Sequence, residues 1–317
     1  MSADELMVVA HRGASGYLPE HTLESTAYGH ALGSDFIETD VVVTRDDQLI
    51  VIHDIHLERV TNVGDRFPDR HREDGRFYAR DFDLAEIKTL NVRERRRSDG
   101  RTPVFPKRFP TGVGTFEVPT LREQIKVIQG MNKATARDVG IFAEVKKPAW
   151  HQEEGVDISR LALQLLDDLG FRTREDNFWL QCFDSDETRR IRRELGCELK
   201  IIQLIEDNAA NESATDYDKM RTPAGLKEIS QYVEAIGPKF THVAKLGEID
   251  GQPVSTGLVS GAHEYDMKVI PWTFRAEHLV PGFESLQEMV AWFNEVLDID
   301  GVFTDFPDMA LAALDIQ

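Results

Sequence analysis

Val8-Val9-Ala10-His11-Arg12-Gly13, close to the start of the chain, is the stretch from which the fold is best predicted. Its apolar half predicts a buried strand over residues 6–11, and its polar half places an imidazole, a guanidinium and a glycine where that strand ends. About one helix later, residues 36–44 predict a second strand that contains Glu38 and Asp40. Because residues two apart in a strand point the same way, these two carboxylates share one face.

A third apolar run, residues 49–53, returns after a short Asp46-Asp47 turn and ends at His53. So short a connection favours an antiparallel hairpin over a crossover. The hairpin would bring His53 back beside Asp40. Imidazoles, a guanidinium and paired carboxylates at neighbouring strand ends indicate phosphate-ester chemistry on a divalent metal.

Short apolar runs and helical patterns alternate along the rest of the chain. Further strands are predicted over residues 140–145, 178–183, 199–204, 235–237, 268–272 and 301–304. Helices are predicted over residues 27–32, from the capping box of Thr120 and Glu123 onward, and over 158–169, 186–195, 226–233, 254–265, 286–297 and 309–314. Eight strand–helix units predict an α/β fold, a (β/α)₈ TIM barrel that spans residues 1–317 as one domain. A doubly wound open sheet is the alternative, but no glycine-rich nucleotide loop follows the first strand.

Residues 57–119 interrupt this alternation with a segment rich in Arg, Asp, Pro and Gly. A structureless loop of that length is uncommon in a compact domain. We therefore predict an insertion after the second strand, with a small fold of its own, that caps the catalytic face. Its aromatic residues argue against a flexible, unstructured loop: Phe67, Phe77, Tyr78, Phe82, Phe105, Phe109 and Phe116.

Composition excludes several classes of partner. The formal net charge is −19, which argues against a surface for nucleic acid or an anionic membrane. The longest apolar runs fall far short of the ~20 residues of a membrane helix, so we expect no membrane insertion. Cys182 and Cys197 are the only cysteines, too few for a disulfide framework, and we interpret both as free and buried.

Charged residues gather at the predicted strand ends, which meet at one mouth of such a barrel. They are His11, Arg12, Glu38, Asp40, Glu144 and Lys146. Charge within an apolar strand is costly unless it is paired or bound to metal. Three of these residues, Glu38, Asp40 and Glu144, form an all-oxygen set suited to Ca²⁺ or Mg²⁺. The alternative is a carboxylate cluster that is merely neutralised by Arg12 and Lys146.

His11 and His53 are the candidate general acid and base, because the pKa of imidazole lies near neutrality. The sequence does not assign the two roles between them. Arg12 and Lys146 are candidates to hold phosphate oxygens and to offset developing charge. Either could instead serve only to neutralise the carboxylates.

The motifs, taken in order, resemble the signature of the glycerophosphodiester phosphodiesterase family. They are His11-Arg12-Gly13, Pro19-Glu20-His21-Thr22, Glu38-x-Asp40, His53-Asp54, Glu144-Val145-Lys146, Gln181-Cys182-Phe183-Asp184, Pro271-Trp272-Thr273 and residues 300–308. No single motif is specific for this family, but all of them together, in this order, are. Residues 15–22 and 65–70 look like the bacterial periplasmic branch. Many relatives carry Asn at the position of His21, so no catalytic role is assigned to it.

The resemblance implies a phospholipase C-like phosphodiesterase barrel that cleaves a P–O bond, releasing sn-glycerol 3-phosphate and an alcohol. Implied substrates are small glycerophosphodiesters such as glycerophosphocholine and glycerophosphoethanolamine. It implies the same three metal ligands, and Ca²⁺ is favoured over Mg²⁺ for the periplasmic type. Attack by a glycerol hydroxyl, through a cyclic intermediate, and direct attack by water both remain open.

Four further residues are predicted to contact substrate. Trp272 and Phe183 would pack on the apolar side of glycerol, although either could be core. Gln181 shares a strand face with Phe183 by parity, so it could reach the site. Glu20 could bond glycerol hydroxyls, orient a histidine, join the metal shell or cap the next helix.

Two other functions stay open on the same barrel: a phospholipase C- or D-like enzyme, which would need an exposed apolar rim, and a non-catalytic binding protein. The start of the chain has neither a basic flank nor an apolar signal core. It therefore fits a cytoplasmic protein or a mature periplasmic one, and the resemblance favours the periplasm. The oligomeric state is left open, with a homodimer as one option.

Overall fold

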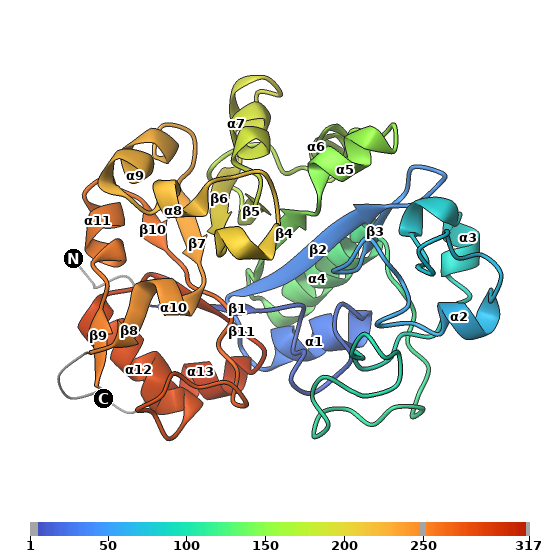
Figure 1. Cartoon of the computed structure of the whole chain (residues 1–317), viewed down its shortest axis with the longest axis horizontal. Helices are drawn as coiled ribbons and strands as arrows, with labels where there is room; N and C mark the ends of the chain where they lie inside the picture. The colour runs from blue at the N-terminus through green and yellow to red at the C-terminus, as the bar shows by residue number, and fades with distance from the viewer. Residues whose placement is uncertain (1–5, 248–251, 315–317) are drawn as a thin grey trace.

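Eight parallel strands form a nearly closed ring in the computed structural model, which describes residues 6–247 and 252–314 (Figure 1). In chain order they are β1 (Met7–Ala10), β2 (Phe36–Val43), β4 (Gly140–Val145), β5 (Phe178–Cys182), β6 (Lys200–Ile205), β7 (Ala235–Pro238), β10 (Lys268–Val269) and β11 (Gly301–Thr304). Neighbours pair in the order β10-β7-β6-β5-β4-β2-β1-β11. Between β10 and β11 the ring is bridged by the Phe303 amide, which donates to the Pro271 carbonyl at 3.0 Å. The predicted (β/α)₈ barrel is therefore confirmed, and the doubly wound sheet is not observed.

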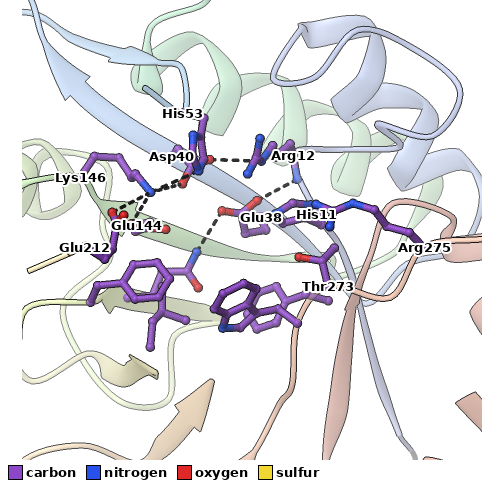
Figure 2. A pocket seen from close by; sticks show the side chains of 15 residues that line it. His11, Arg12, Glu38, Asp40, His53, Glu144, Lys146, Glu212, Thr273 and Arg275 are labelled. Carbon is purple, nitrogen blue, oxygen red and sulfur yellow. Dashed lines mark hydrogen bonds and ion pairs between the residues drawn. The ribbon is translucent and has the colours of Figure 1, made fainter. Parts of the chain in front are cut away.

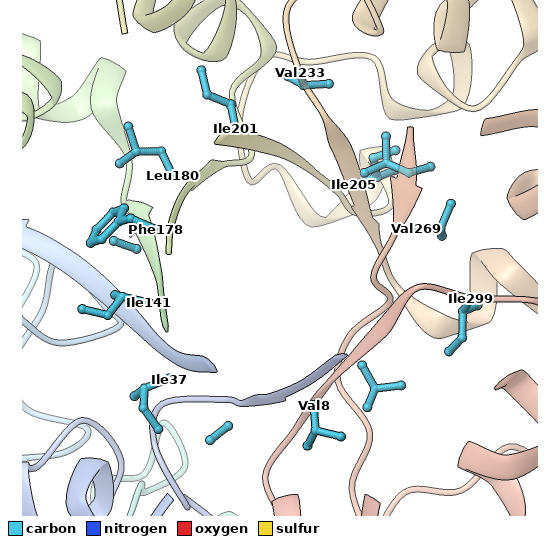
Figure 3. Close-up of a cluster of buried hydrophobic side chains, with 14 of the residues drawn as sticks. Val8, Ile37, Ile141, Phe178, Leu180, Ile201, Ile205, Val233, Val269 and Ile299 are labelled. Atoms are coloured by element: carbon cyan, nitrogen blue, oxygen red, sulfur yellow. The ribbon is translucent and has the colours of Figure 1, made fainter. Parts of the chain in front are cut away.

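Strand alternation divides the core into two layers. One apolar residue from each strand or its extension fills the barrel interior: Val9, Phe36, Phe142, Trp179, Ile202, Ala235, Ile270 and Phe303. The alternate residues, including Val8, Ile37, Ile141, Leu180 and Ile201, point outward and pack under the surrounding helices (Figure 3). Polar residues then follow two positions further along the interior faces of several strands. The barrel thus has an apolar floor with a polar layer above it.

Helices surround the ring, and most were predicted from their patterns. The longer ones are α1 (Leu23–Ala31), α4 (Leu121–Thr135), α5 (Pro148–Glu153), α6 (Ile158–Asp168), α7 (Ser185–Arg193), α9 (Pro223–Ile229), α11 (Leu258–His263), α12 (Leu286–Leu297) and α13 (Pro307–Leu314). The shorter ones are η2 (Asn208–Ala210), α8 (Tyr217–Met220) and α10 (Phe240–Val243). The capping box is confirmed: Thr120 Oγ1 accepts from the Glu123 amide at 3.1 Å, and Glu123 Oε2 accepts from the Thr120 amide at 2.7 Å.

Several predicted elements were wrong in extent. The helices expected over residues 27–32 and 226–233 are observed as α1 and α9, and each begins three or four residues earlier than expected. The helix expected over residues 254–265 is confined to α11, and Val254 belongs to an antiparallel hairpin of β8 (Ala244–Leu246) and β9 (Pro253–Ser255). Gly257 precedes α11 with φ +85°, a backbone conformation that a helix cannot include. The strand expected over residues 268–272 ends at Val269, shortly before Pro271, which has no amide to donate to a neighbour.

The predicted hairpin after the second strand is confirmed, because β3 (Leu49–Val51) pairs antiparallel with β2. The chain then enters residues 57–119, which contain α2 (Val63–Arg66), η1 (Ala79–Asp81) and α3 (Leu84–Ile87). A separate apolar cluster centred on Leu57, Phe82 and Ile87 packs this insertion against Ile50 of β3. Whether the insertion caps the catalytic face stays a prediction.

Two expectations from composition concern residues that the structure describes. Cys182 and Cys197 are both free and buried, as predicted. Within residues 6–247 and 252–314, no helix combines the length and the apolar character needed to cross a bilayer. The expectation about compartment depends on Met1 to Glu5, which lie outside the described residues.

Candidate active site

One cavity opens at the carboxyl ends of the barrel strands (Figure 2). Ten of the residues singled out in the sequence line it: His11, Arg12, Glu38, Asp40, His53, Glu144, Lys146, Gln181, Phe183 and Trp272. They lie in β2, β4 and β5, directly after the ends of β1, β4 and β5, at the hairpin end after β3 and in the segment after β10. The parallel register therefore gathers residues that are up to 261 positions apart, from His11 to Trp272.

Three carboxylates form the centre of this cavity. Asp40 of β2 lies opposite Glu144 of β4, and Glu144 lies opposite Gln181 of β5. Glu38 precedes Asp40 by two residues and therefore shares its face. Glu38, Asp40 and Glu144 are all buried, and one oxygen from each lies within 4.8 Å of the others.

The carboxylates differ in what neutralises them. Glu38 accepts from the Arg12 amide at 2.7 Å and from Gln181 Nε2 at 3.0 Å, both neutral donors. Asp40 accepts from His21 Nε2 at 2.7 Å and lies 3.5 Å from Arg12 Nε. Glu144 lies 2.7 Å from Lys146 Nζ.

The charges around the three carboxylates favour a bound cation. Burial and the neighbouring Asp40 raise the pKa of Glu38 well above its ordinary value. Burial also raises the pKa of Glu144, with a further contribution from Asp40 that Lys146 does not cancel. Asp40 alone has a lowered pKa, because Lys146, His53 and His21 outweigh its burial. Arg12 and Lys146 therefore do not neutralise the whole cluster. Its hard oxygen donors can hold a metal ion.

Each candidate histidine is held by an aspartate through the same ring atom. His11 Nδ1 lies 2.6 Å from Asp305 Oδ1, and His53 Nδ1 lies 2.5 Å from Asp54 Oδ1. A carboxylate at Nδ1 favours the tautomer with its proton there, so the Nε2 lone pair is the one available for chemistry. Both imidazoles therefore carry their proton on Nδ1 and present the lone pair of Nε2 for chemistry.

Both imidazoles are neutral at neutral pH. Burial, followed by the charge of Arg12, lowers the pKa of His11 to about 4. Burial, followed by Arg12 and Lys146, lowers the pKa of His53 to about 3. An arriving phosphate anion would offset those positive charges and raise both values toward the range useful for proton transfer.

The two basic residues that were predicted for the cavity, Lys146 and Arg12, contact several partners each. Lys146 Nζ lies 2.7 Å from Glu144 Oε1, 3.7 Å from Asp40 Oδ1 and 3.4 Å from His53 Nε2. Glu144 and Asp40 raise its pKa despite burial, so Lys146 stays charged. Arg12 Nη1 donates to Glu20 Oε1 at 3.1 Å. Both cations are thus placed beside the carboxylates and open to the cavity.

The four predicted substrate contacts fall in two places. Phe183 and Trp272 line the cavity with their rings edge to face, 5.6 Å apart, and Gln181 lies on the same wall. Trp272 Nε1 also donates to the Gly237 carbonyl at 2.7 Å. Glu20 is not among the lining residues, because its oxygens bond Arg95 and Arg12 instead. Its direct contact with a lining residue is the bond from Arg12.

Sequence reasoning missed several residues of the site. Asp54 and Asp305 stood inside quoted motifs, and the only available signal for each was its position beside a histidine or at a strand end. Glu212, Thr273 and Arg275 also line the cavity. Glu212 lies 3.9 Å from Lys146 Nζ, yet it comes from an irregular polar segment that carries no pattern.

Comparisons with known proteins give a consistent result. The sequence model of the glycerophosphoryl diester phosphodiesterase family matches residues 11–309. A glycerophosphodiester phosphodiesterase of Haemophilus influenzae is 38% identical, over 99% of this chain and 91% of the relative. A crystal structure from Silicibacter pomeroyi DSS-3, provisionally assigned to the same activity, has a TM-score of 0.73 and 25% identity, covering 98% of this chain and 94% of that one. A phosphodiesterase of Oleispira antarctica, solved with the product sn-glycerol-3-phosphate, has a TM-score of 0.65 and 19% identity over 98% and 96% of the two chains.

Proposed function

This chain belongs to the glycerophosphoryl diester phosphodiesterase family, and from that premise we propose how its cavity carries out the reaction. The enzyme is a phosphoric diester hydrolase that converts glycerophosphodiesters to glycerol 3-phosphate and an alcohol. The observation that supports the assignment of residues is the meeting, in one cavity, of a buried carboxylate trio and two aspartate-held histidines.

Glu38, Asp40 and Glu144 would hold one divalent cation, Ca²⁺ rather than Mg²⁺. Three buried protein carboxylates are a hard oxygen set, and Ca²⁺ accepts more protein ligands and looser geometry than Mg²⁺, which retains several waters. A bound divalent cation supplies positive charge that stabilises the phosphoryl oxygens and lowers the pKa of a hydroxyl group brought to it.

His11 and His53 would move the two protons of the reaction. One neutral imidazole takes the proton of the attacking hydroxyl at Nε2. The other, protonated at Nε2 once the bound phosphate has raised its pKa, donates that proton to the leaving alcohol oxygen as the P–O ester bond breaks. Arg12 and Lys146 would bind non-bridging phosphate oxygens, where their charge counters the negative charge that develops at phosphorus.

The remaining contacts would position the glycerol group. Phe183 and Trp272 offer two ring surfaces to its carbon side, and Gln181 offers an amide on the same wall. Glu20 would orient Arg12 through the bond between Glu20 Oε1 and Arg12 Nη1. The insertion, residues 57–119, would cover the catalytic face and influence which alcohol is accepted.

A phospholipase-like activity on the same barrel is disfavoured by the surface. The large apolar side chains that are exposed in the described residues are Tyr28, Val113, Leu246, Val254 and Val296. None of them lines the cavity, which disfavours binding of a lipid there. A periplasmic location, which we also propose, is supported by the likeness of residues 15–22 to the periplasmic branch, and cell fractionation tests it.

The decisive assay offers glycerophosphocholine and vesicles of phosphatidylcholine to the same enzyme. The proposal expects glycerol 3-phosphate from the first and no release of soluble product from the second. Glu144→Gln serves as the inactive control, because it keeps the size of the side chain and removes its charge. Equal turnover of both substrates would overturn the proposed preference for the water-soluble diester.

A further inference from the structure

Two arginines of the insertion reach the aspartates that hold the two histidines. Arg95 Nη1 donates to Asp54 Oδ2 at 2.7 Å, and Arg108 Nη2 donates to Asp305 Oδ2 at 2.7 Å. Neither arginine lines the cavity. The same arrangement of imidazole, carboxylate and guanidinium thus occurs twice, and the guanidinium comes from residues 57–119 each time.

Arg95 forms the more extensive of the two contacts. Its remaining nitrogens donate two hydrogen bonds to the Glu20 carboxylate, from Nη2 to Oε1 at 2.6 Å and from Nε to Oε2 at 2.9 Å. The side chains of Arg95 and Glu20 are only 9% and 11% exposed, so these charges are shielded from water. The Arg95 guanidinium therefore connects Asp54, which holds His53, with Glu20, which bonds Arg12.

Arg108 contacts Asp305, directly after the last barrel strand β11, and further partners elsewhere in the chain. It donates to both oxygens of Glu277, at 2.9 and 3.1 Å, and to the Ser15 carbonyl at 3.2 Å, while its guanidinium lies 3.7 Å from the centre of the Phe105 ring. Its side chain is 5% exposed. Asp305 Oδ2 also accepts from Arg275 Nε at 2.6 Å, and Arg275 lies outside the insertion.

We propose that Arg95 and Arg108 are positioning residues, through which the insertion fixes both imidazoles for proton transfer. The inference rests on the proposed roles of His11 and His53. A buried aspartate stays ionised and oriented only if a charge and hydrogen bonds compensate its desolvation. An ionised aspartate in turn holds Nδ1–H, so that Nε2 of each ring keeps its direction toward the cavity.

The two arginines are unequal in a way that can be measured. Among the described residues, Arg95 is the arginine that pairs with Asp54, whereas Asp305 is paired with both Arg108 and Arg275. Removal of Arg95 should therefore lower kcat more than removal of Arg108. Removal of Arg108 and Arg275 together should lower kcat more than removal of either one alone.

The experiment measures kcat and KM for glycerophosphocholine in Arg95→Met, Arg95→Lys and Arg108→Met. We expect kcat to fall about 10- to 100-fold in Arg95→Met with a smaller change in KM, less in Arg108→Met, and partial recovery in Arg95→Lys. Arg95→Ala should regain activity when guanidinium is added at non-denaturing concentration. In proton NMR, the downfield Nδ1–H signal of His53 should be lost in Arg95→Met while that of His11 remains.

Arg72→Met is the matched control. Arg72 also belongs to the insertion, pairs with Asp81 at 2.8 Å and with Glu154 of the barrel at 2.6 Å, and contacts neither histidine nor aspartate of the site. It should keep the wild-type kcat. An equal loss in Arg72→Met and Arg95→Met would mean that docking of the insertion is what matters, and it would overturn the positioning role.

His11→Ala and His53→Ala are assayed beside the arginine variants to separate two failures. Inactive histidine variants together with wild-type kcat in folded Arg95→Met and Arg108→Met would overturn this inference and leave the proposed function intact. Full activity in the histidine variants would overturn the proposed function itself. If Arg95→Met does not fold, Arg95→Lys and the NMR signal of its His53 decide the question.

Discussion

Asp40 and Glu144 lie opposite each other in the register of two neighbouring parallel strands, and both point into the barrel mouth. This pairing places two like charges side by side in a buried position, with Glu38 on the same face as Asp40. Such a placement is unfavourable unless positive charge is supplied. The register of the sheet therefore creates the demand for a cation that the proposed function depends on.

Removal of metal should abolish activity. Exhaustive chelation should reduce turnover to background, and Ca²⁺ should restore it more fully than Mg²⁺, because Ca²⁺ accepts several protein carboxylates in a loose geometry whereas Mg²⁺ retains several waters. Ca²⁺ at about 100 times its Kd should also raise the free energy of unfolding by about 2.7 kcal/mol. Steady-state rates and thermal unfolding with and without Ca²⁺ measure both effects, and Glu38→Gln should lose the stabilisation.

Loss of either histidine should slow the chemical step. His11→Ala and His53→Ala should each lower kcat on the order of 10²-fold or more, because each ring is assigned one proton transfer. His263→Ala is a suitable control, since His263 bonds Asp300 at 2.9 Å and does not line the cavity. A rate equal to wild type in either active-site variant would remove that residue from the reaction.

Loss of the Trp272 ring should affect substrate binding more than chemistry. Trp272→Ala removes a wall of the cavity that faces Phe183 but leaves the carboxylates and histidines in place. We expect KM to rise about 10-fold with little change in kcat, because the lost contact is the same in the ground and transition states. A fall in kcat at unchanged KM would show instead that the indole acts on the reacting atoms.

Glu94 should make the stability of the protein depend on pH. Burial, followed by the charge of Glu20, raises the pKa of Glu94 to about 8, and its Oε2 has no hydrogen-bond partner. The folded state therefore binds this proton more tightly than the unfolded state. Its stabilising effect is complete below the ordinary pKa of 4.5 and is lost as pH rises toward 8, by up to about 1.4 kcal/mol per pH unit.

Glu94→Gln isolates that contribution. The variant should be more stable than wild type at pH 8 and should show a flatter pH profile between pH 5 and 8, because the amide does not titrate. Urea unfolding at a series of pH values measures the difference. Parallel profiles of the two proteins would show that Glu94 does not titrate in this range.

The barrel and much of the cavity could be predicted because they follow from local rules. Strand parity places Gln181 and Phe183 on one face, and the structure has both on the cavity wall. The capping box at Thr120 marked the start of α4 correctly. Parallel strand ends meet at one mouth in such a barrel, so Glu144 could be assigned to the same site as Asp40 without a known contact.

Contacts between distant segments could not be predicted. Arg95 and Arg108 meet Asp54 and Asp305 through contacts between segments far apart in the chain, and no periodicity of the sequence reports such contacts. The role assigned to Glu20 stayed open for the same reason, since its partner Arg95 is 75 residues away in sequence. The β8–β9 hairpin was missed because each of its strands has three residues, too few for an alternation of apolar and polar residues to be recognised.

The central claim is tested most directly by anomalous diffraction from crystals grown with Ca²⁺. The account predicts a single anomalous peak between Glu38, Asp40 and Glu144, with carboxylate oxygens about 2.3–2.6 Å from the ion. Active enzyme whose crystals show no peak there at saturating Ca²⁺, with Lys146 still bound to Glu144 in its place, would contradict it.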